Sequence, residues 1–490
     1  MFETAMAVEA KERLLDIHFG RHLARWAQAP KISQRAFTSF LAGFLLLLYT
    51  QLLCTQRSQA QVVTVNWGST DQVIDGFGAA TAGRRLTSAQ ATFLFSTSSG
   101  NLGLSLLRTD VPDDGSCSTV NTTCAGEVSN MQLALANGAQ VWSTPWSPPA
   151  SMKTNGNTTC NAGPGNGSLS VGSYSDYATY LANYVTSLSS LYGIQLYALS
   201  VQNEPDNCPS YPGALWSGAN FDTFIKTLGP AFASAGISNT LIMTPESSRF
   251  SALAPIASVV MADPAAASYV GIIAWHDYDN APSVTNPYAS QKKLYWETEA
   301  SAGPGYGPSL CGGCWDPSMA DALMWAQIVD NRMAVANANA WNYWEAVGYT
   351  DDNEGLTNIY QTVSVSKRAY MLGNYSMFVR PGFYRIDATH TPQPGVLVSA
   401  YNNSSTGALV IVVINQNSSA VSQSFTLSGA IASNLTPWIT SNSLNLAQQS
   451  AVSVTGGSFT YSLPGYSITS FVGNATASLA PPTGLTATVK

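Results

Sequence analysis

Short apolar runs with the character of β-strands alternate with amphipathic helical stretches between about residues 75 and 346. The helical stretches include Tyr174–Leu191, Phe221–Ala235 and Ser318–Asn337. Eight strand–helix units over roughly 270 residues predict an α/β fold, a (β/α)8 TIM barrel, because each helix can cover the strands beside it. The eight runs are Val73–Gly78, Gly103–Val111, Ala139–Trp146, Ile194–Glu204, Thr240–Glu246, Val270–Tyr278, Lys293–Glu299 and Asn339–Glu345.

The pattern changes after about Arg380, where strands follow one another between turns rich in Asn, Ser and Gly. These strands predict a small attached β-sandwich. We expect residues 61–74 to add an N-terminal strand to it, with the barrel over 75–379, the sandwich over 380–475 and a linker to a further module over 476–490. The predicted strands are Val396–Tyr401, Ala408–Asn415, Ser422–Leu427, Ala451–Val454, Ser458–Leu463 and Ser467–Val472.

An apolar run near the N-terminus, Phe37–Leu53, follows Lys31 and Arg35 and precedes a small-x-small cleavage site at residues 58–60. This order predicts a secretory signal peptide with a long leader, so residues 1–60 are excluded from the fold. The alternative is a single membrane anchor, although the run is slightly short to span a bilayer. We therefore expect a secreted protein, extracellular or periplasmic, without stable membrane insertion.

Six cysteines remain after the leader, and an even number in an exported chain predicts disulfides. The favoured pairs are Cys117–Cys124, Cys160–Cys208 and Cys311–Cys314. His276 and His390 are the only histidines of this part, too few for a zinc site or a histidine-based triad. No metal and no cofactor are therefore expected.

The chain has a net charge of −7, and charged residues make up only 10% of it. This balance argues against a nucleic-acid partner, which requires a basic surface to neutralise phosphates. A surface of uncharged polar residues, with 12 Trp and 22 Tyr in the chain, suits a protein that handles sugars. A polysaccharide partner and a monomeric state are expected.

The fourth predicted strand ends in Asn203 and Glu204, at the barrel face that carries active sites. Strand alternation predicts that Ala198, Ser200, Gln202 and Glu204 face the barrel interior, whereas Tyr197, Leu199 and Val201 face the helices. Glu204 then projects inward at the top of the barrel. The structural alternative is that the Glu204 carboxylate interacts with the free backbone N–H groups at the N-terminus of the following helix.

The seventh strand ends in Glu299, on the opposite side of the barrel from Glu204. One carboxyl group can protonate a leaving oxygen while the other attacks an anomeric carbon, as in retaining glycoside hydrolysis. Glu297 competes for the second role, because it shares the strand parity of Glu299 and would point inward about 6.6 Å deeper. A buried carboxylate needs a partner, for which Arg108 is a candidate. Glu246 and Glu345 are interpreted as hydrogen-bonding residues.

Aromatic residues at the strand ends predict a platform for sugar rings, whose C–H faces stack on Trp and Tyr. Trp146, Tyr278 and Trp344 occupy such positions. Asn203 is expected to hydrogen-bond a sugar hydroxyl.

At these residues the chain resembles glycoside hydrolase family 30, specifically its bacterial glucuronoxylanase-like members. The resemblance implies a TIM barrel with a β-sandwich built from both ends of the chain, and endo-cleavage of β-1,4-xylan. It implies Glu204 as acid/base, Glu299 rather than Glu297 as nucleophile, and Tyr278 as the residue that orients the nucleophile. The matching segments are Gln72–Gly78, Pro145–Pro149, Met152–Gly156, Ser200–Asp206, Trp296–Glu299, Ser366–Tyr370 and Phe378–Gly382.

One departure from the family concerns the loop after the seventh strand, Ala300–Pro317. The glucuronate-requiring xylanases place there an Arg that binds the uronic acid, whereas this loop contains no Lys or Arg. We therefore expect a xylanase without strict glucuronate dependence. Another β-glycan, β-1,6-galactan or β-1,6-glucan, is the alternative substrate. A non-catalytic carbohydrate-binding protein is the alternative of another class, and the absence of a Gly-x-Ser-x-Gly elbow excludes a typical esterase.

Overall fold

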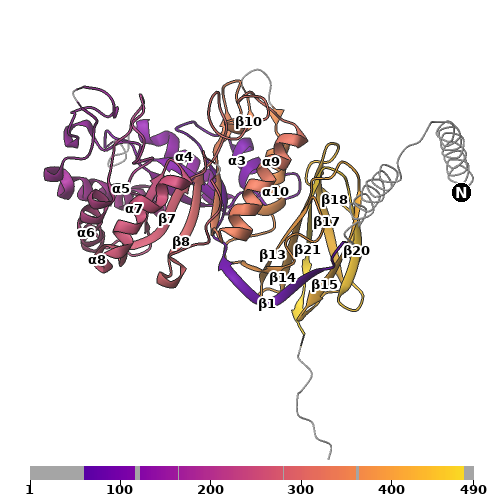
Figure 1. The fold of residues 1–490 in the computed structure, drawn as a ribbon. Coiled ribbons are helices and arrows are strands. Elements are labelled where there is room, and N and C mark those ends of the chain that lie inside the picture. Colours follow the sequence, from indigo (N-terminus) through magenta and orange to yellow (C-terminus); the bar gives the residue numbers. More distant parts are fainter. Residues whose placement is uncertain (1–59, 116–121, 164, 280, 360–363, 479–490) are drawn as a thin grey trace, which may run out of the picture. The chain divides into compact units, whose positions relative to one another are not determined.

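The computed structural model describes residues 60–115, 122–163, 165–279, 281–359 and 364–478 (Figure 1). The predicted signal peptide, Cys117 and most of the predicted C-terminal linker lie outside these residues. Among the described helices, none combines the length and the apolar character needed to cross a membrane.

Eight parallel strands form a closed barrel, in which β9 pairs with both β2 and β8. Each of the eight strands falls on one of the predicted runs, so the TIM barrel is confirmed. Strands β10 (Gly355–Asn358) and β11 (Ser364–Val365) extend the sheet beyond β9. The barrel strands are β2 (Gly76–Ala80), β3 (Leu106–Asp110), β4 (Gln140–Thr144), β5 (Ala198–Ser200), β6 (Leu241–Ser247), β7 (Val270–His276), β8 (Leu294–Glu299) and β9 (Ala340–Gly348).

Helices cover the barrel and follow its strands, except that the described residues between β7 and β8 contain only the 3-10 turn Ala289–Gln291 in place of the expected helix (Figure 1). A capping box at Ser217 and Asn220 begins α6, and Gly193, in the left-handed region with φ 67°, ends α5. The predicted helix Ser318–Asn337 is interrupted, because α9 continues into a π-helical turn over Asn331–Val335. The helices are α3 (Ser88–Phe95), α4 (Thr122–Ala136), α5 (Tyr174–Tyr192), α6 (Gly218–Ser234), α7 (Phe250–Ala262), α8 (Pro264–Ala267), α9 (Met319–Asp330) and α10 (Lys367–Ser376).

The barrel interior is filled by side chains rather than open. Trp142 and Trp296 meet edge to face at 6.0 Å, among small residues such as Ala198 and Ala340. The prediction for Tyr197 is wrong, because its ring stacks on Trp296 instead of facing the helices. Tyr197 precedes β5, so strand alternation does not hold it. A packed interior leaves the ends of the barrel as the places where a ligand can bind.

The C-terminal strands form one mixed sheet in the order β18-β17-β21-β14-β13-β12-β1-β15-β20, with β19 beside β17. Phe425 and Phe459 contact Phe471 across the core, so the sheet folds into the predicted sandwich. The strands are β1 (Val63–Val73), β12 (Tyr384–Ala388), β13 (Val396–Asn403), β14 (Ala408–Asn415), β15 (Val421–Ser428), β17 (Asn434–Ser441), β18 (Ala447–Gln448), β19 (Val452–Ser453), β20 (Ser458–Leu463) and β21 (Ser467–Asn474), with β16 (Ala430–Ile431) and β22 (Thr476–Ala477) as a separate pair.

Three strands of this sheet escaped prediction, β12, β17 and β18, as did the separate pair β16 and β22. The sequence of β17 is polar and contains Pro437, which disfavours a strand in isolation. The N-terminal strand β1 runs parallel to β15 and antiparallel to β12, so it lies within this sheet.

The sandwich is attached to the barrel through α10. Asn374 donates hydrogen bonds to the carbonyl oxygen of Trp438 and to Oγ of Ser470, both at 3.0 Å. The ring of Phe378 packs on Trp438 at 5.1 Å.

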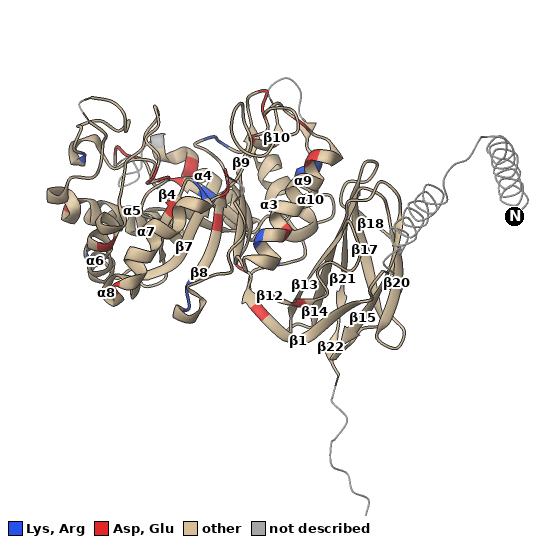
Figure 2. Ribbon diagram, in the orientation of Figure 1, with Lys and Arg blue, Asp and Glu red and all other residues tan. Residues whose placement is uncertain are grey.

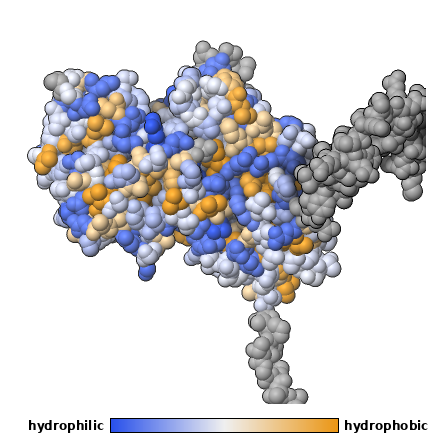
Figure 3. Space-filling model, in the orientation of Figure 1, coloured by the Kyte–Doolittle hydropathy of each residue, from blue (hydrophilic) through white to orange (hydrophobic). Residues whose placement is uncertain are grey.

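The face of the molecule in Figure 3 mixes hydrophilic and hydrophobic residues in small patches. The expected monomeric state stays a prediction.

Candidate active site

A cleft of about 760 Å³ lies at the C-terminal ends of the barrel strands. All six residues predicted for the site, Trp146, Asn203, Glu204, Tyr278, Glu299 and Trp344, line it. Charged residues are sparse along the described ribbon, and both signs occur close together near β4 and β7 (Figure 2). The other lining residues are Ala82, Gly83, Arg84, Asp110, Asn207, Tyr211, Pro212, Ser248, Arg249, Tyr306, Glu345 and Glu354.

Arg108 on β3 joins several strands beneath the cleft. Its guanidinium is fully buried and donates to Asn203 Oδ1 at 2.6 Å and to Glu246 Oε1 at 2.8 Å. It also forms an ion pair with Glu299. Leu106, two residues earlier on β3, belongs to the interior cluster, so alternation alone places Arg108 inside the barrel. The predicted pairing of Arg108 with Glu297 is wrong, because Arg108 serves Glu246 and Glu299.

Glu204 reaches the cleft through an unusual backbone conformation. Strand β5 ends at Ser200, and Glu204 has a φ of 45°, in the left-handed region that non-glycine residues rarely adopt. Its backbone N–H donates to the carbonyl oxygen of Glu246 at 3.1 Å. Its Oε2 accepts hydrogen bonds from Asn207 Nδ2 at 2.8 Å and from Tyr211 Oη at 3.2 Å.

Gln202 does not continue the inward face that alternation predicted for this strand. Its side-chain amide donates to the carbonyl oxygen of Trp146 at 2.7 Å, and its Oε1 accepts from the indole of Trp216 at 3.2 Å. The regular ladder has already ended at Ser200, so the side chains beyond it follow local contacts. Both Asn203 and Glu204 line the cleft as a result.

A register shift separates Glu299 from Glu297. On β7, Trp275 lies opposite Glu297, and the next residue, His276, lies opposite Glu299. Strand β8 thus contains one extra residue, Thr298, at this point, as in a β-bulge. Leu294 packs against the interior cluster and Trp296 belongs to it, so alternation gives Glu297 the opposite, outward direction. The predicted shared inward parity of Glu297 and Glu299 is therefore wrong.

Glu297 is fully buried and does not line the cleft. Its carboxylate accepts from the backbone N–H groups of Glu299 at 2.8 Å and Asn342 at 2.9 Å. Burial and the charge of Asp277 raise the pKa of Glu297 well above its ordinary value, despite these two hydrogen bonds. Glu297 therefore braces the bulge that presents Glu299.

Glu299 is held from two further sides at its carboxylate. Tyr278 Oη donates to Oε1 at 2.6 Å, while Arg108 pairs with Oε2. Burial and the negative charge of Glu299 raise the pKa of Tyr278 well above its ordinary value, so the phenol remains a hydrogen-bond donor.

His276 on β7 lies among three carboxylates. Its Nδ1 is 3.0 Å from Glu204 Oε1, and its Nε2 is 3.5 Å from Glu246 Oε1. Burial lowers the pKa of His276, but the charge of Glu299 and the hydrogen bonds to Glu204 and Glu246 outweigh burial and raise it to about 10. The ring is therefore a cation at neutral pH. Burial raises the pKa of Glu204, but His276, Asn207 and Tyr211 together bring it below the ordinary value.

Glu204, His276 and Glu299 each offer one atom within 4.8 Å of the others, which is the spacing of a candidate metal site. Arg108 and Tyr278 contact the carboxylate of Glu299, and Asn207 and Tyr211 contact that of Glu204. The three residues of this group are therefore part of a hydrogen-bonded and charge-paired network.

The same distance bears on catalysis, because a carboxylate oxygen of Glu204 lies within 4.8 Å of one of Glu299. Retaining glycosidases hold their two carboxyl groups about 5–5.5 Å apart, whereas inverting enzymes leave about 6.5–9.5 Å for a water molecule. The oxygens of Glu204 and Glu299 lie closer than the inverting spacing, which favours the retaining class.

Two of the predicted aromatic platforms stand together at the floor of the cleft. The rings of Trp146 and Trp344 lie 5.8 Å apart, and the guanidinium of Arg108 lies 4.6 Å from the ring of Trp146. The guanidinium contacts the Trp146 ring as a cation–π partner, and both indoles line the cleft in which a sugar would bind.

The family comparison agrees with this geometry. The model of the "Glycosyl hydrolase family 30 TIM-barrel domain" matches residues 126–386. The chain is 34% identical over 436 residues to glucuronoxylanase XynC of Bacillus subtilis, which covers 86% of this chain and 93% of that protein. The chain belongs to glycoside hydrolase family 30. Members of this family are retaining enzymes, so the alternative of a non-catalytic binding protein is set aside.

Solved structures point to the same part of the family. The family 30 subfamily 8 xylanase Xyn30A of Clostridium acetobutylicum is 34% identical, with a TM-score of 0.74, over 85% of this chain and 100% of that one. A family 30 endoxylanase of Clostridium papyrosolvens is 33% identical, with a TM-score of 0.72, over 84% of this chain and 100% of that one. This family 30 hydrolase is thus xylanase-like.

The expected contact of Tyr278 with Glu299 is present. Sequence reasoning missed Arg108 as a partner of Glu299, and His276, Asn207 and Tyr211 as partners of Glu204. His276 follows the interior residues Ile272 and Ala274 at strand spacing, so its inward direction was readable from the sequence. Asn207 and Tyr211 carry no such signal, because they lie in an irregular segment.

Proposed function

We propose that this protein is a retaining endo-β-1,4-xylanase in which Glu204 is the acid/base and Glu299 is the nucleophile. The observation that carries the proposal is the separation of at most 4.8 Å between their nearest carboxylate oxygens, at the cleft. Both carboxylates are accessible from the cleft, whereas Glu297 is not.

In the first step Glu299 attacks the anomeric carbon while Glu204 protonates the departing oxygen. Arg108 and Tyr278 contact the two oxygens of the attacking carboxylate and hold it in position. The attack converts Glu299 into a neutral ester. The loss of this negative charge favours ionised Glu204, which then deprotonates the water that releases the sugar.

Xylan is the proposed substrate because the relatives with at least 33% identity are named as xylanases or a glucuronoxylanase. The paired indoles of Trp146 and Trp344 suit the C–H faces of a pyranose. Exposed Tyr211 and Tyr306 add aromatic surface to the cleft on the loops after β5 and β8, so several sugar units can bind, as endo-cleavage requires.

We propose that the enzyme does not strictly require glucuronate. From the loop Ala300–Pro317, only Tyr306 lines the cleft. Of the two cleft-lining arginines, Arg84 is paired with Glu345 at 3.2 Å. Arg249 is exposed and forms no ion pair with the described residues. A lone exposed cation gives a carboxylate modest affinity, in contrast to a buried bidentate site.

The test compares initial rates on glucuronoxylan, unsubstituted xylan, β-1,6-galactan and β-1,6-glucan, with products resolved by size. Comparable rates on both xylans and a ladder of oligosaccharides are expected. NMR should show that the β-anomer of the product forms first. A strong requirement for the uronic acid contradicts the proposal that glucuronate is not needed. Preferred cleavage of a β-1,6-linked polymer contradicts the proposed xylanase activity.

We further propose that residues 1–60 are removed during export, on the strength of the apolar run and the cleavage site described above. N-terminal sequencing of protein recovered from the medium or periplasm tests this, and an intact apolar segment in a membrane fraction contradicts it.

A further inference from the structure

We propose that the Cys160–Cys208 disulfide is a positioning element for Glu204. It holds the irregular segment 207–212 so that Asn207 and Tyr211 keep their hydrogen bonds to the Glu204 carboxylate. The inference rests on the proposed role of Glu204 as acid/base.

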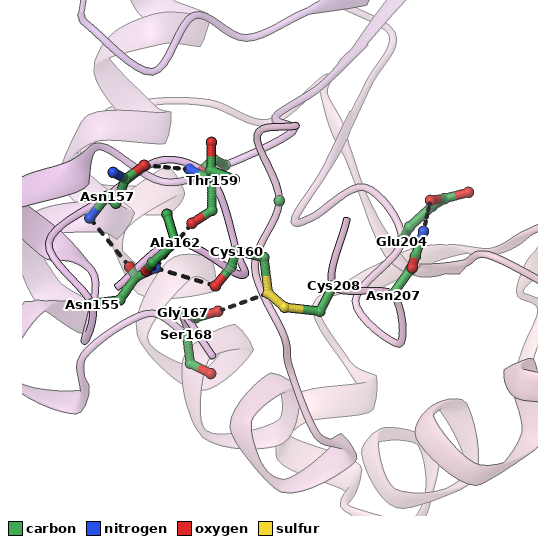
Figure 4. The surroundings of a disulfide bond; sticks show 12 residues. Asn155, Asn157, Thr159, Cys160, Ala162, Gly167, Ser168, Glu204, Asn207 and Cys208 are labelled. Atoms are coloured by element: carbon green, nitrogen blue, oxygen red, sulfur yellow. Dashed lines mark hydrogen bonds between the residues drawn. A yellow bond between two sulfur atoms is a disulfide. The ribbon is translucent and has the colours of Figure 1, made fainter. Parts of the chain in front are cut away.

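The bridge lies beside Asn207, the first of these hydrogen-bond donors (Figure 4). Cys208 directly follows Asn207, whose Nδ2 is 2.8 Å from Glu204 Oε2. Tyr211, three residues beyond Cys208, reaches the same oxygen at 3.2 Å. The segment contains no regular helix or strand in the described structure. Its backbone is held by a turn bond from Asn207 N–H to the carbonyl oxygen of Glu204 and by an isolated bridge between Pro212 and Thr159, and the disulfide adds the covalent attachment between them.

The other end of the bridge is a firm anchor. Cys160 is fully buried, and Asn155 Nδ2 donates to its carbonyl oxygen and to those of Thr159 and Ala162. Lys153 Nζ joins the two segments, because it donates to the carbonyl oxygen of Thr158 at 2.7 Å and to that of Gly213 at 2.6 Å. The disulfide thus ties Glu204's hydrogen-bond donors to a loop that is itself hydrogen-bonded throughout.

Loss of the bridge should act on Glu204 selectively. Of the titratable groups that face Glu204, only Tyr211 belongs to the tethered segment. Release of the segment removes two hydrogen bonds that lower the pKa of Glu204 and leaves the effect of His276 in place. The groups on other elements are His276 on β7, Tyr278 after β7, Glu299 on β8, Glu246 on β6 and Arg108 on β3.

A second disulfide provides a matched control. Cys311 and Cys314 are bonded to each other within the loop after β8, and both residues are exposed. Ser309 Oγ donates to the sulfur of Cys311, and the sulfurs otherwise lie near the carbonyl oxygens of Cys314 and Trp315, away from Glu204 and Glu299. Removal of this bridge should leave Glu204 unaffected.

The experiment compares the Cys160→Ala/Cys208→Ala variant with Cys311→Ala/Cys314→Ala and the unmodified enzyme. The kcat/KM values are measured against pH on a xylo-oligosaccharide and on a dinitrophenyl xylobioside, whose leaving group needs no protonation. On the oligosaccharide, kcat/KM of the first variant should fall about tenfold, which is less than the roughly 100-fold or greater loss expected when a general acid is removed altogether. The basic limb of its pH profile should move to higher pH. Its kcat/KM on the activated substrate should change by less than about twofold. The control should match the unmodified enzyme.

Equal losses on both substrates, or an unmoved basic limb, would overturn the proposal. If the first variant does not fold, Asn207→Ala/Tyr211→Phe keeps the bridge and removes both donors, and it must reproduce the shift or the proposal fails. Glu204→Ala separates the two claims. If it loses both substrates equally, the acid/base assignment itself is wrong.

Discussion

The Nδ1 atom of His276 lies 3.0 Å from Oε1 of Glu204, in a ring that is fully buried beneath the cleft. Because the nearby carboxylates raise the pKa of His276 to about 10, this contact joins a cation to the proposed acid/base. The positive charge of His276 therefore disfavours protonation of Glu204, so the pKa of Glu204 depends on the groups that surround His276.

His276→Asn should move the pH dependence of kcat/KM. The imidazolium lowers the pKa of Glu204, so its replacement by a neutral amide should raise that pKa. Since the proposed acid must be protonated, the basic limb should move to higher pH. A profile on unsubstituted xylan measures this, and a basic limb that moves to lower pH contradicts the interpretation.

Glu299→Ala should lose at least about a thousandfold in kcat, as expected when a nucleophile is removed. Azide should restore turnover of an activated xyloside and give a glycosyl azide of inverted configuration, because it enters the space of the missing carboxylate. Glu297→Ala is the matched comparison. Azide rescue of Glu297→Ala but not of Glu299→Ala would reverse the assignment.

Arg108→Met should lower the free energy of unfolding at pH 7 by about 3–5 kcal/mol, because the buried Glu246 loses its guanidinium partner and keeps only the longer contact with His276 and the Thr144 hydroxyl. Burial raises the pKa of Glu246, but Arg108 and His276 bring it below its ordinary value of 4.5. A depressed pKa stabilises the fold above about pH 4.5, and this stabilisation is lost as the pH falls through the folded-state pKa. Urea unfolding should therefore show a difference that shrinks below pH 4.5. A difference independent of pH contradicts this account.

Arg249→Ala should affect only substrates with a carboxylate. An exposed ion pair contributes about 0.2–1 kcal/mol, so kcat/KM on glucuronoxylan should fall by no more than about fivefold. The rate on unsubstituted xylan should not change. Arg249→Lys, which keeps the charge, serves as the control, and equal losses on both polymers would assign Arg249 a structural role.

The sequence by itself determined the barrel strands and pointed to Glu204 and Glu299 as residues of the cleft. Strand and helix periodicities are local, so all eight barrel strands were predicted close to their observed positions. Alternation on β5 correctly placed Ala198 inside the barrel and Leu199 and Val201 against the helices. Polar residues at strand ends then marked the cleft, because the carboxyl ends of parallel strands meet at one face of a barrel.

Only the tertiary structure decided how the carboxylates are held. Alternation holds while the ladder is regular, and it failed at Gln202, beyond the end of β5, and at Glu297, next to the register shift in β8. The partner of Arg108 was also out of reach, because Glu299 lies 191 residues away along the chain. Contacts at such separations depend on closure of the barrel, which no local pattern encodes.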